Sequence, residues 1–288
     1  MLISEVIEAV KAYCKGTGPD GLPLDPDKTR VRVLYGEVDR ECTGIVTCIW
    51  ASMDVIREAA ARGANLIISH EALFWHHGDH TSWLRAQRNA AFLAKTALLD
   101  KHGITVWRCH DYIHSGIPSP VDGTCVDGIF WGLVDLLDWQ PKSVEPLADQ
   151  AVLLSASLDG RTAVQLGRDV AAALGTRGVR LIGDPETPVH RVGVAMHMSP
   201  SLDNAMITAM EEGIDCMLAM ETNDYTLLQY VRDSSQAGVP KAVLSCGHFN
   251  IEDPGMAYML NWLPEALGTG ELPMCHVAAG DPFQYVLV

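Results

Sequence analysis

The sequence contains no Cys-x-x-Cys pair, although it has eight cysteines. Several of them lie inside apolar runs, such as Cys216 in IDCMLAM and Cys246 in AVLSC. In a reducing cytosol, cysteines of this kind behave as small buried hydrophobic residues. A cysteine-rich zinc site is therefore not expected.

Long apolar stretches and a targeting signal are also missing. No run of about 18 uncharged apolar residues occurs, so no membrane span and no membrane partner are expected. The N-terminal segment MLISEVIEAVKAYCKG carries acidic residues early and has neither a basic start nor a small-residue cleavage site. It has the pattern of an amphipathic helix, and we expect the protein in the cytoplasm.

Basic residues are scarce. Lys plus Arg total 21 and Asp plus Glu total 36, which gives a formal net charge of −15. A charge of this sign repels phosphate backbones and anionic lipids, and the sequence has no Lys/Arg cluster to offset it. We therefore expect no nucleic-acid partner and attribute the acidity to solubility.

The Gly-x-Ser-x-Gly elbow and the phosphate-binding loop are absent, so serine hydrolase and kinase functions lack support. What is present is an ordinary globular composition, with 48% hydrophobic and 20% charged residues. The 288 residues are enough for a well-buried core in one large domain or two smaller ones.

Short apolar runs alternate with helical patterns along most of the chain. VRVLYGEV, GIVTCIW, ANLIISH and ITVWRC are predicted strands, and residues 83–103 are predicted to form one long helix. The second half repeats this style, and the alternation predicts an α/β fold with helices covering the strands. The predicted segments are an N-terminal helix and loop (1–29), a first half (30–138), a linker (139–149) and a second half (150–288), with one continuous domain as the alternative.

An internal repeat supports the two halves. RGANLIISHE (62–71) aligns with EGIDCMLAME (212–221), and HGITVWRCH (102–110) aligns loosely with AGVPKAVLSCGH (237–248). Each half therefore has two strands that end in His or Glu. The repeat is short, but it places polar residues at equivalent positions in both halves.

Three predicted strands end in residues that bind metals. LIIS is followed by His70 and Glu71, VWRC by His110 and VLSC by Gly247-His248. Ligands of α/β sheets bind at the carboxyl ends of the strands, so these side chains are expected to converge. His114 and Glu252 each follow a histidine by four residues, a spacing that places both side chains on one helical face or across a tight turn. A single histidine at a strand end is usually structural, but three such ends favour a metal site.

Other polar residues near these strand ends have weaker claims. His76, His77 and His80 fall in the loop FWHHGDHTSW, where a solvated loop is favoured over direct ligation and a lid that contacts substrate is the alternative. Glu221 is a candidate substrate contact, although METND also fits a helix N-cap. Asp111 follows His110 and is a candidate to orient an imidazole.

These strand ends resemble the Nif-three-like family, also called GTP cyclohydrolase 1 type 2-like proteins. The family has His-His-Pro after an early strand, then His-x-x-x-Asp, and Gly-His-x-x-x-Glu near the C-terminus. The matching segments here are ANLIISHEALF, VWRCHDYIH and CGHFNIED, and EGIDCMLAMETND and GTCVDGIFWGLVDLLDW also resemble family segments. The resemblance covers roughly residues 30–288.

The resemblance implies an α/β fold with internal duplication, a dinuclear metal centre between the halves, and a homo-oligomer that is commonly a hexamer. Two positions depart from the family pattern: Glu71 replaces its second His, and His114 replaces its Asp. The exchange keeps one imidazole and one carboxylate across the pair, so a two-metal site remains chemically consistent. The metal ligands expected are His70, Glu71, His110, His114, His248 and Glu252.

Together these features suggest metal-assisted hydrolysis of a small polar substrate, such as a heterocycle or cyclic amide with a hydrolysable C–N bond. Two divalent cations (Zn, Fe, Mn, Co or Ni) would activate a water, with Glu252 near the bridging position. Glu71 would serve as ligand or general base, and a histidine of the 76–80 loop would protonate the leaving nitrogen. The alternatives are a metal carrier without turnover and a regulatory scaffold with a vestigial site.

Overall fold

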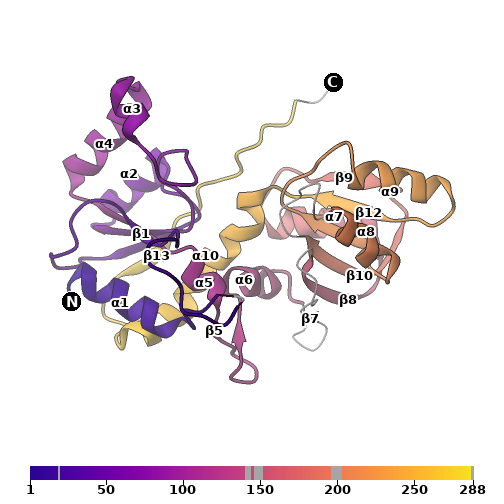
Figure 1. Cartoon of the computed structure of the whole chain (residues 1–288), viewed down its shortest axis with the longest axis horizontal. Helices are drawn as coiled ribbons and strands as arrows, with labels where there is room; N and C mark the ends of the chain where they lie inside the picture. Colours follow the sequence, from indigo (N-terminus) through magenta and orange to yellow (C-terminus); the bar gives the residue numbers. More distant parts are fainter. Residues whose placement is uncertain (19, 140–143, 146–151, 196–202, 287–288) are drawn as a thin grey trace. The chain divides into compact units, whose positions relative to one another are not determined.

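The computed structural model describes residues 1–286 except 19, 140–143, 146–151 and 196–202 (Figure 1). The chain forms two compact units. The first comprises residues 1–132 and 253–280, and the second comprises residues 133–252 and 281–288. Two helices, α6 (Gly128–Leu136) and α10 (His248–Leu267), cross from one unit into the other.

The first unit is built on a five-stranded sheet with the order β1-β4-β3-β2-β13. Strand β1 is antiparallel to β4, and the remaining neighbours are parallel. The strands are β1 (Arg32–Tyr35), β2 (Ile45–Cys48), β3 (Leu66–Ser69), β4 (Thr105–Arg108) and β13 (Met274–His276). The helices are α1 (Ile3–Tyr13), α2 (Met53–Ala61), α3 (Ser82–Ala86), α4 (Ala90–His102) and α5 (Asp111–Ser115), and β5 (Ile117–Pro118) pairs with β6 (Cys125–Val126) as a separate ribbon.

The core of the first unit surrounds three strands that are buried along their whole length. Every residue of β2, β3 and β4 is buried, because the sheet is covered on both faces. Alternate residues such as Val46, Ile67 and Val106 pack with the apolar faces of α2 and α4. On the opposite face, the Thr47 hydroxyl donates to the Met256 carbonyl of α10 at 2.8 Å. Helix α10 in turn meets α6 closely, since a Cβ on Gly132 would lie 2.5 Å from the Gly255 Cα.

The second unit contains a six-stranded sheet with the order β7-β8-β10-β11-β12-β9. Among its described strands, β11 pairs in parallel with β10 and with β12, and the other neighbours are antiparallel. Its strands are β7 (Val144–Glu145), β8 (Val152–Thr162), β9 (Arg180–Gly183), β10 (Pro188–Ala195), β11 (Cys216–Ala219) and β12 (Ala242–Ser245). Helices α8 (Asp203–Glu211) and α9 (Leu227–Gln236) cover one face, and α7 (Ala163–Ala173) packs on Leu244 from the other.

The α/β class predicted from the sequence is confirmed, and the two sheets share a topology. In each, a parallel trio is bordered by an antiparallel strand: β2-β3-β4 with β1, and β10-β11-β12 with β9. The strands aligned by the sequence repeat, β3 with β11 and β4 with β12, occupy equivalent places. The duplication therefore positions two sets of strand ends in the same way.

Two details differ from the sequence-based expectations, and a third prediction falls largely on residues that the structure does not describe. The helix expected over 83–103 is two helices, because Arg88 adopts a left-handed φ of 50° and the Asn89 side chain then caps α4. Strand β13 pairs with β2 in the first sheet, although its residues were assigned to the second half. Of the linker expected over 139–149, residues 140–143 and 146–149 lie outside the described part of the chain.

No helix among the described residues is both long and apolar enough to cross a membrane.

Candidate metal centre

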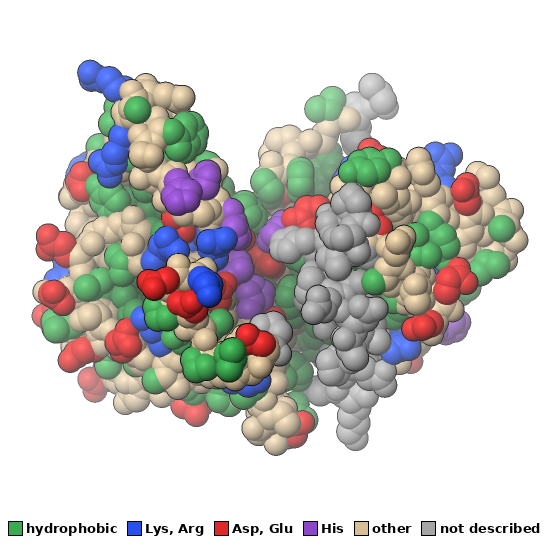
Figure 2. All heavy atoms as spheres, viewed as in Figure 1, with side chains coloured by type: hydrophobic (Ala, Val, Ile, Leu, Met, Phe, Trp, Pro, Cys, Tyr) green, Lys and Arg blue, Asp and Glu red, His purple; other side chains and the backbone are tan. Residues whose placement is uncertain are grey.

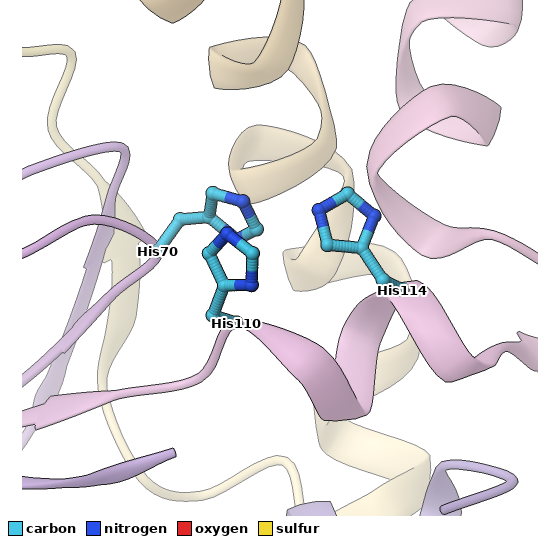
Figure 3. A group of neighbouring side chains, drawn as sticks. All are labelled: His70, His110 and His114. Carbon is cyan, nitrogen blue, oxygen red and sulfur yellow. The ribbon is translucent and has the colours of Figure 1, made fainter. Parts of the chain in front are cut away.

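Three histidines converge at the carboxyl end of the first sheet. His70 directly follows β3, His110 caps the start of α5 after β4, and His114 lies one helical turn later. Each offers a ring nitrogen, and the three nitrogens lie within 4.8 Å of one another. Figure 3 shows the His114 ring beside the rings of His70 and His110, which stack on each other with their centroids 4.4 Å apart. Because β3 and β4 are parallel neighbours, with Ser69 opposite Arg108, their ends meet at the same edge.

Two of these imidazoles are oriented by carboxylates. The His110 Nδ1 lies 2.7 Å from Asp111 Oδ1, and the His114 Nδ1 lies 2.9 Å from Asp127 Oδ2. The carboxylate accepts a hydrogen bond from Nδ1–H, which leaves the Nε2 lone pair for a metal. Burial opposes ionisation of Asp111, but hydrogen bonds from His110, Thr29 and the Arg30 amide outweigh it and hold the Asp111 pKa well below its usual range. Asp111 therefore stays anionic and keeps the His110 ring in place.

Glu71 pairs with a buried arginine. The Glu71 Oε2 lies 2.9 Å from the Arg108 Nη2, and the Arg108 side chain is fully buried. His70 is also fully buried, whereas Glu71 is partly accessible. Glu71 thus directly follows the cluster residue His70 in the chain, and Arg108 holds its carboxylate. Whether it acts as ligand or base stays a prediction.

The loop after β3 carries three exposed histidines, and they differ in their distance from the cluster. His77 comes nearest to the cluster, with its ring centroid 5.9 Å from that of His110. Burial, and then the Arg108 charge, lower the His77 pKa. His76 and His80 pack against each other at 4.9 Å and are exposed. Figure 2 shows exposed histidine side chains in purple at the upper left of the view.

The second unit carries its own cluster at the end of β12. The His248 Nδ1 lies 2.6 Å from Glu221 Oε1, and its Nε2 lies 2.9 Å from Glu252 Oε2 on the next turn of α10. Glu221 therefore orients His248 as Asp111 orients His110. The N-cap alternative for METND does not hold, because α9 starts at Leu227 with Thr226 as its cap residue.

Sequence reasoning missed two residues of this region. Asp127 precedes α6, and its carboxylate accepts from the Ile129 amide, so a helix-start signal was available for it. Asp127 also orients the His114 ring, but this is a tertiary contact that leaves no local pattern in the sequence. The missed signal for Arg108 was a charged residue inside an otherwise buried strand, which is rare without paired partners.

The donor set fits a divalent transition ion. Imidazole ligands suit Zn, Cu, Fe and Ni. The fit rests on three prearranged rings, one of them from a fully buried side chain, and two of them fixed by carboxylates. Among the described residues, the cluster of His70, His110 and His114 is therefore a candidate metal-binding group.

Two relatives of known sequence match most of the chain. A protein of Clostridium acetobutylicum named GTP cyclohydrolase 1 type 2 homolog is 23% identical over 254 residues, covering 85% of each chain. A protein of the same name from Clostridium perfringens is 21% identical and covers 89% of this chain and 91% of its own. The chain thus spans nearly the full length of both relatives.

Solved structures share the fold at low identity. A Staphylococcus aureus hypothetical protein superposes with a TM-score of 0.72, 17% identity and 99% coverage of both chains. Reduced HcgD from Methanocaldococcus jannaschii gives a TM-score of 0.62 and 17% identity, covering 96% of this chain and 97% of its own. A model of the Duf34/NIF3 (NGG1p interacting factor 3) family matches residues 25–279. The resemblance in the strand-end motifs is therefore confirmed, and this chain is a divergent member of the DUF34/NIF3 family.

Proposed function

We propose that this protein is a metal-dependent hydrolase that cleaves a C–N bond in a small polar substrate. The convergence of His70, His110 and His114 carries the proposal. Three protein ligands on one ion leave a coordination position for water, which is the arrangement of catalytic sites. The carboxylates on the far side of His110 and His114 favour a site that is prepared before metal arrives.

The proposal includes a second ion, for which the second unit offers His248 and Glu252. His248 has the same Nδ1–carboxylate pairing as the first-unit histidines, and its Nε2 faces Glu252. The ion types that this mixed donor set suits are Zn, Fe, Mn, Co and Ni.

A bound divalent ion would lower the pKa of a coordinated water toward neutrality and polarise the substrate. The chain supplies the remaining functions. Glu71 contributes a carboxylate able to accept a proton from the attacking water. The lowered pKa of His77 favours its neutral form near pH 7, so we assign it to hydrogen bonding with substrate. Protonation of the leaving nitrogen then falls to His76 or His80.

Two observations support a small heterocyclic or cyclic-amide substrate. The clostridial relatives are named as homologs of a GTP cyclohydrolase, which favours ring opening as the reaction class. A pocket of about 340 Å³, lined by Lys15, Asp111, His114 and Ser115 among others, lies within the first unit. Its volume suits a small molecule. Self-association into a homo-oligomer remains a prediction.

Turnover assays with metal-loaded protein test the proposal. The loaded protein is assayed against cyclic amides and against purine-like and pteridine-like rings, with His110→Ala and His248→Ala as loss-of-site variants. His102→Ala serves as the matched control, because His102 is exposed in the last turn of α4. Activity that disappears in both site variants and persists in the control supports a hydrolase. Activity that survives His110→Ala rejects the assigned site, and metal binding without turnover favours the carrier alternative.

A further inference from the structure

Arg108 is a fully buried guanidinium with a complete set of acceptors. Its Nε donates to the His70 carbonyl at 3.0 Å. Its Nη1 donates to the His77 carbonyl at 2.8 Å and to Asp79 Oδ2 at 3.1 Å. Its Nη2 lies 2.9 Å from Glu71 Oε2 and 3.4 Å from His77 Nδ1. The five N–H groups of an arginine are thus all directed at acceptors.

All these acceptors belong to one segment, residues 70–79, which leaves the end of β3 and carries Glu71 and His77. Arg108 itself comes from β4, two positions before His110. One side chain therefore ties both ends of the loop to the strand that supplies another ligand of the histidine cluster. Trp75 and Asp79 each adopt a φ of 59°, in the left-handed region that is unfavourable for residues other than glycine. The loop therefore contains two backbone conformations that local geometry alone disfavours.

We propose that Arg108 is a positioning residue for the proposed metal centre: it fixes the Glu71 carboxylate and the His77 imidazole beside the ligands His70 and His110. This inference rests on the proposed function. Three contacts carry it: the pairing with Glu71, the carbonyl bond to the ligand residue His70, and the placement of His77 with its ring 5.9 Å from His110.

Arginine is required at this position because the acceptors lie in different directions. A lysine ammonium has three donors on one atom, whereas the guanidinium spreads five over a rigid plane. Lysine can keep a charge near Glu71 but cannot also reach two carbonyls and Asp79. Asp79 is itself shared, since its Oδ2 lies 3.9 Å from the Arg32 Nε. The network therefore holds the loop from its far end as well.

A second side chain holds the same loop, at a residue that belongs to neither the histidine cluster nor the Arg108 contacts. The buried Lys95 of α4 donates to the Leu73 carbonyl at 2.7 Å and contacts neither Glu71 nor His77 through any hydrogen bond in the described chain. A substitution at Lys95 therefore loosens the loop without removing the contacts assigned to Arg108. This makes Lys95→Met the matched control for Arg108→Met.

The test is a titration of the metal-free full-length protein with Co²⁺, followed by the visible absorption of the bound ion. The spectrum reports ligand geometry, which a change in overall stability does not alter. We expect Arg108→Met to bind Co²⁺ about 10- to 100-fold more weakly with a changed spectrum, as for other residues that orient metal ligands. Arg108→Lys should recover part of the affinity, and Lys95→Met should match wild type.

Asp79→Asn covers the case in which Arg108→Met does not fold. This substitution weakens the contact between residue 79 and Arg108 at the far end of the loop. It should therefore lower Co²⁺ affinity, but by less than Arg108→Met does. Wild-type affinity and spectrum in the folded Arg108→Met or in Asp79→Asn overturn the inference, as does an equal loss in Lys95→Met. Absence of Co²⁺ binding by wild-type protein overturns the proposed metal centre and this inference together.

Discussion

Replacing Lys95 with methionine should change how the stability of the protein depends on pH. The Lys95 side chain is 1% exposed and lies among aromatic rings, with its Nζ 5.4 Å from the Trp50 ring centroid. Burial lowers the pKa of Lys95 from 10.5 to about 8. Between these values the unfolded chain carries a proton that the folded chain has released. Stability conferred by this residue therefore rises with pH across that window and is lowest below it.

The size of the effect follows from the two pKa values. A shift from 10.5 to about 8 corresponds to roughly 3 kcal/mol, at about 1.36 kcal/mol per tenfold change in proton affinity. Starting from pH 7, wild type should gain roughly 1 kcal/mol from Lys95 by pH 9 and about 2–3 kcal/mol by pH 10. Methionine has no proton to release, so the variant misses this gain. Comparing the two proteins cancels groups that titrate in both, such as Cys14, whose pKa burial raises to about 12.

The assay is urea unfolding followed by tryptophan fluorescence at pH 7, 8, 9 and 10. The control is Lys101→Met, on the same helix but exposed, which should follow wild type at every pH. As pH rises, the free energy of unfolding of wild type should increase relative to that of Lys95→Met. Parallel curves for the two proteins from pH 7 to pH 10 would show that Lys95 is not desolvated as argued.

Three further substitutions test other contacts. Asp127→Asn should weaken metal binding about 10- to 100-fold, measured by Co²⁺ titration, because Asp127 orients His114. Lys241→Met should lower the free energy of unfolding by about 1–3 kcal/mol, because its ammonium holds two buried carbonyls at the end of α8. Gly132→Ala should cost about 1–3 kcal/mol in the same measurement, because the new Cβ would lie 2.5 Å from the Gly255 Cα.

Each of these has a result that contradicts it. Unchanged Co²⁺ affinity in Asp127→Asn would mean that the Nδ1 contact does not prepare His114 for metal. A wild-type unfolding midpoint in Lys241→Met would mean that water replaces the ammonium at those carbonyls. Full stability in Gly132→Ala would mean that α6 and α10 can separate at their crossing without loss.

The buried strands and the histidine cluster were accessible from the sequence because their signals are local. Apolar runs of four to seven residues mark β2, β3 and β4, and the polar residues follow at once, as in LIIS-His70. Parallel strands then bring these ends to one edge. The four-residue spacing of His110 and His114 likewise needs only one turn of helix to bring the rings together.

The remaining features depend on contacts between distant segments. Asp127 reaches His114 across thirteen positions, and Arg108 gathers acceptors from residues 70–79. Neither pairing leaves a periodic pattern. The split of the helix expected over 83–103 depends on the left-handed backbone at Arg88, a residue type with no preference for it. The place of β13 beside β2 is decided by tertiary pairing alone.

We propose that the cluster of His70, His110 and His114 holds a catalytic divalent metal. The most direct measurement is metal content per chain by elemental analysis, after reconstitution and removal of excess ion, for wild type, His114→Ala and the control His102→Ala. We expect two equivalents in wild type and in the control, and the loss of at least one in His114→Ala. No bound metal in wild type, or equal content in wild type and His114→Ala, would contradict it.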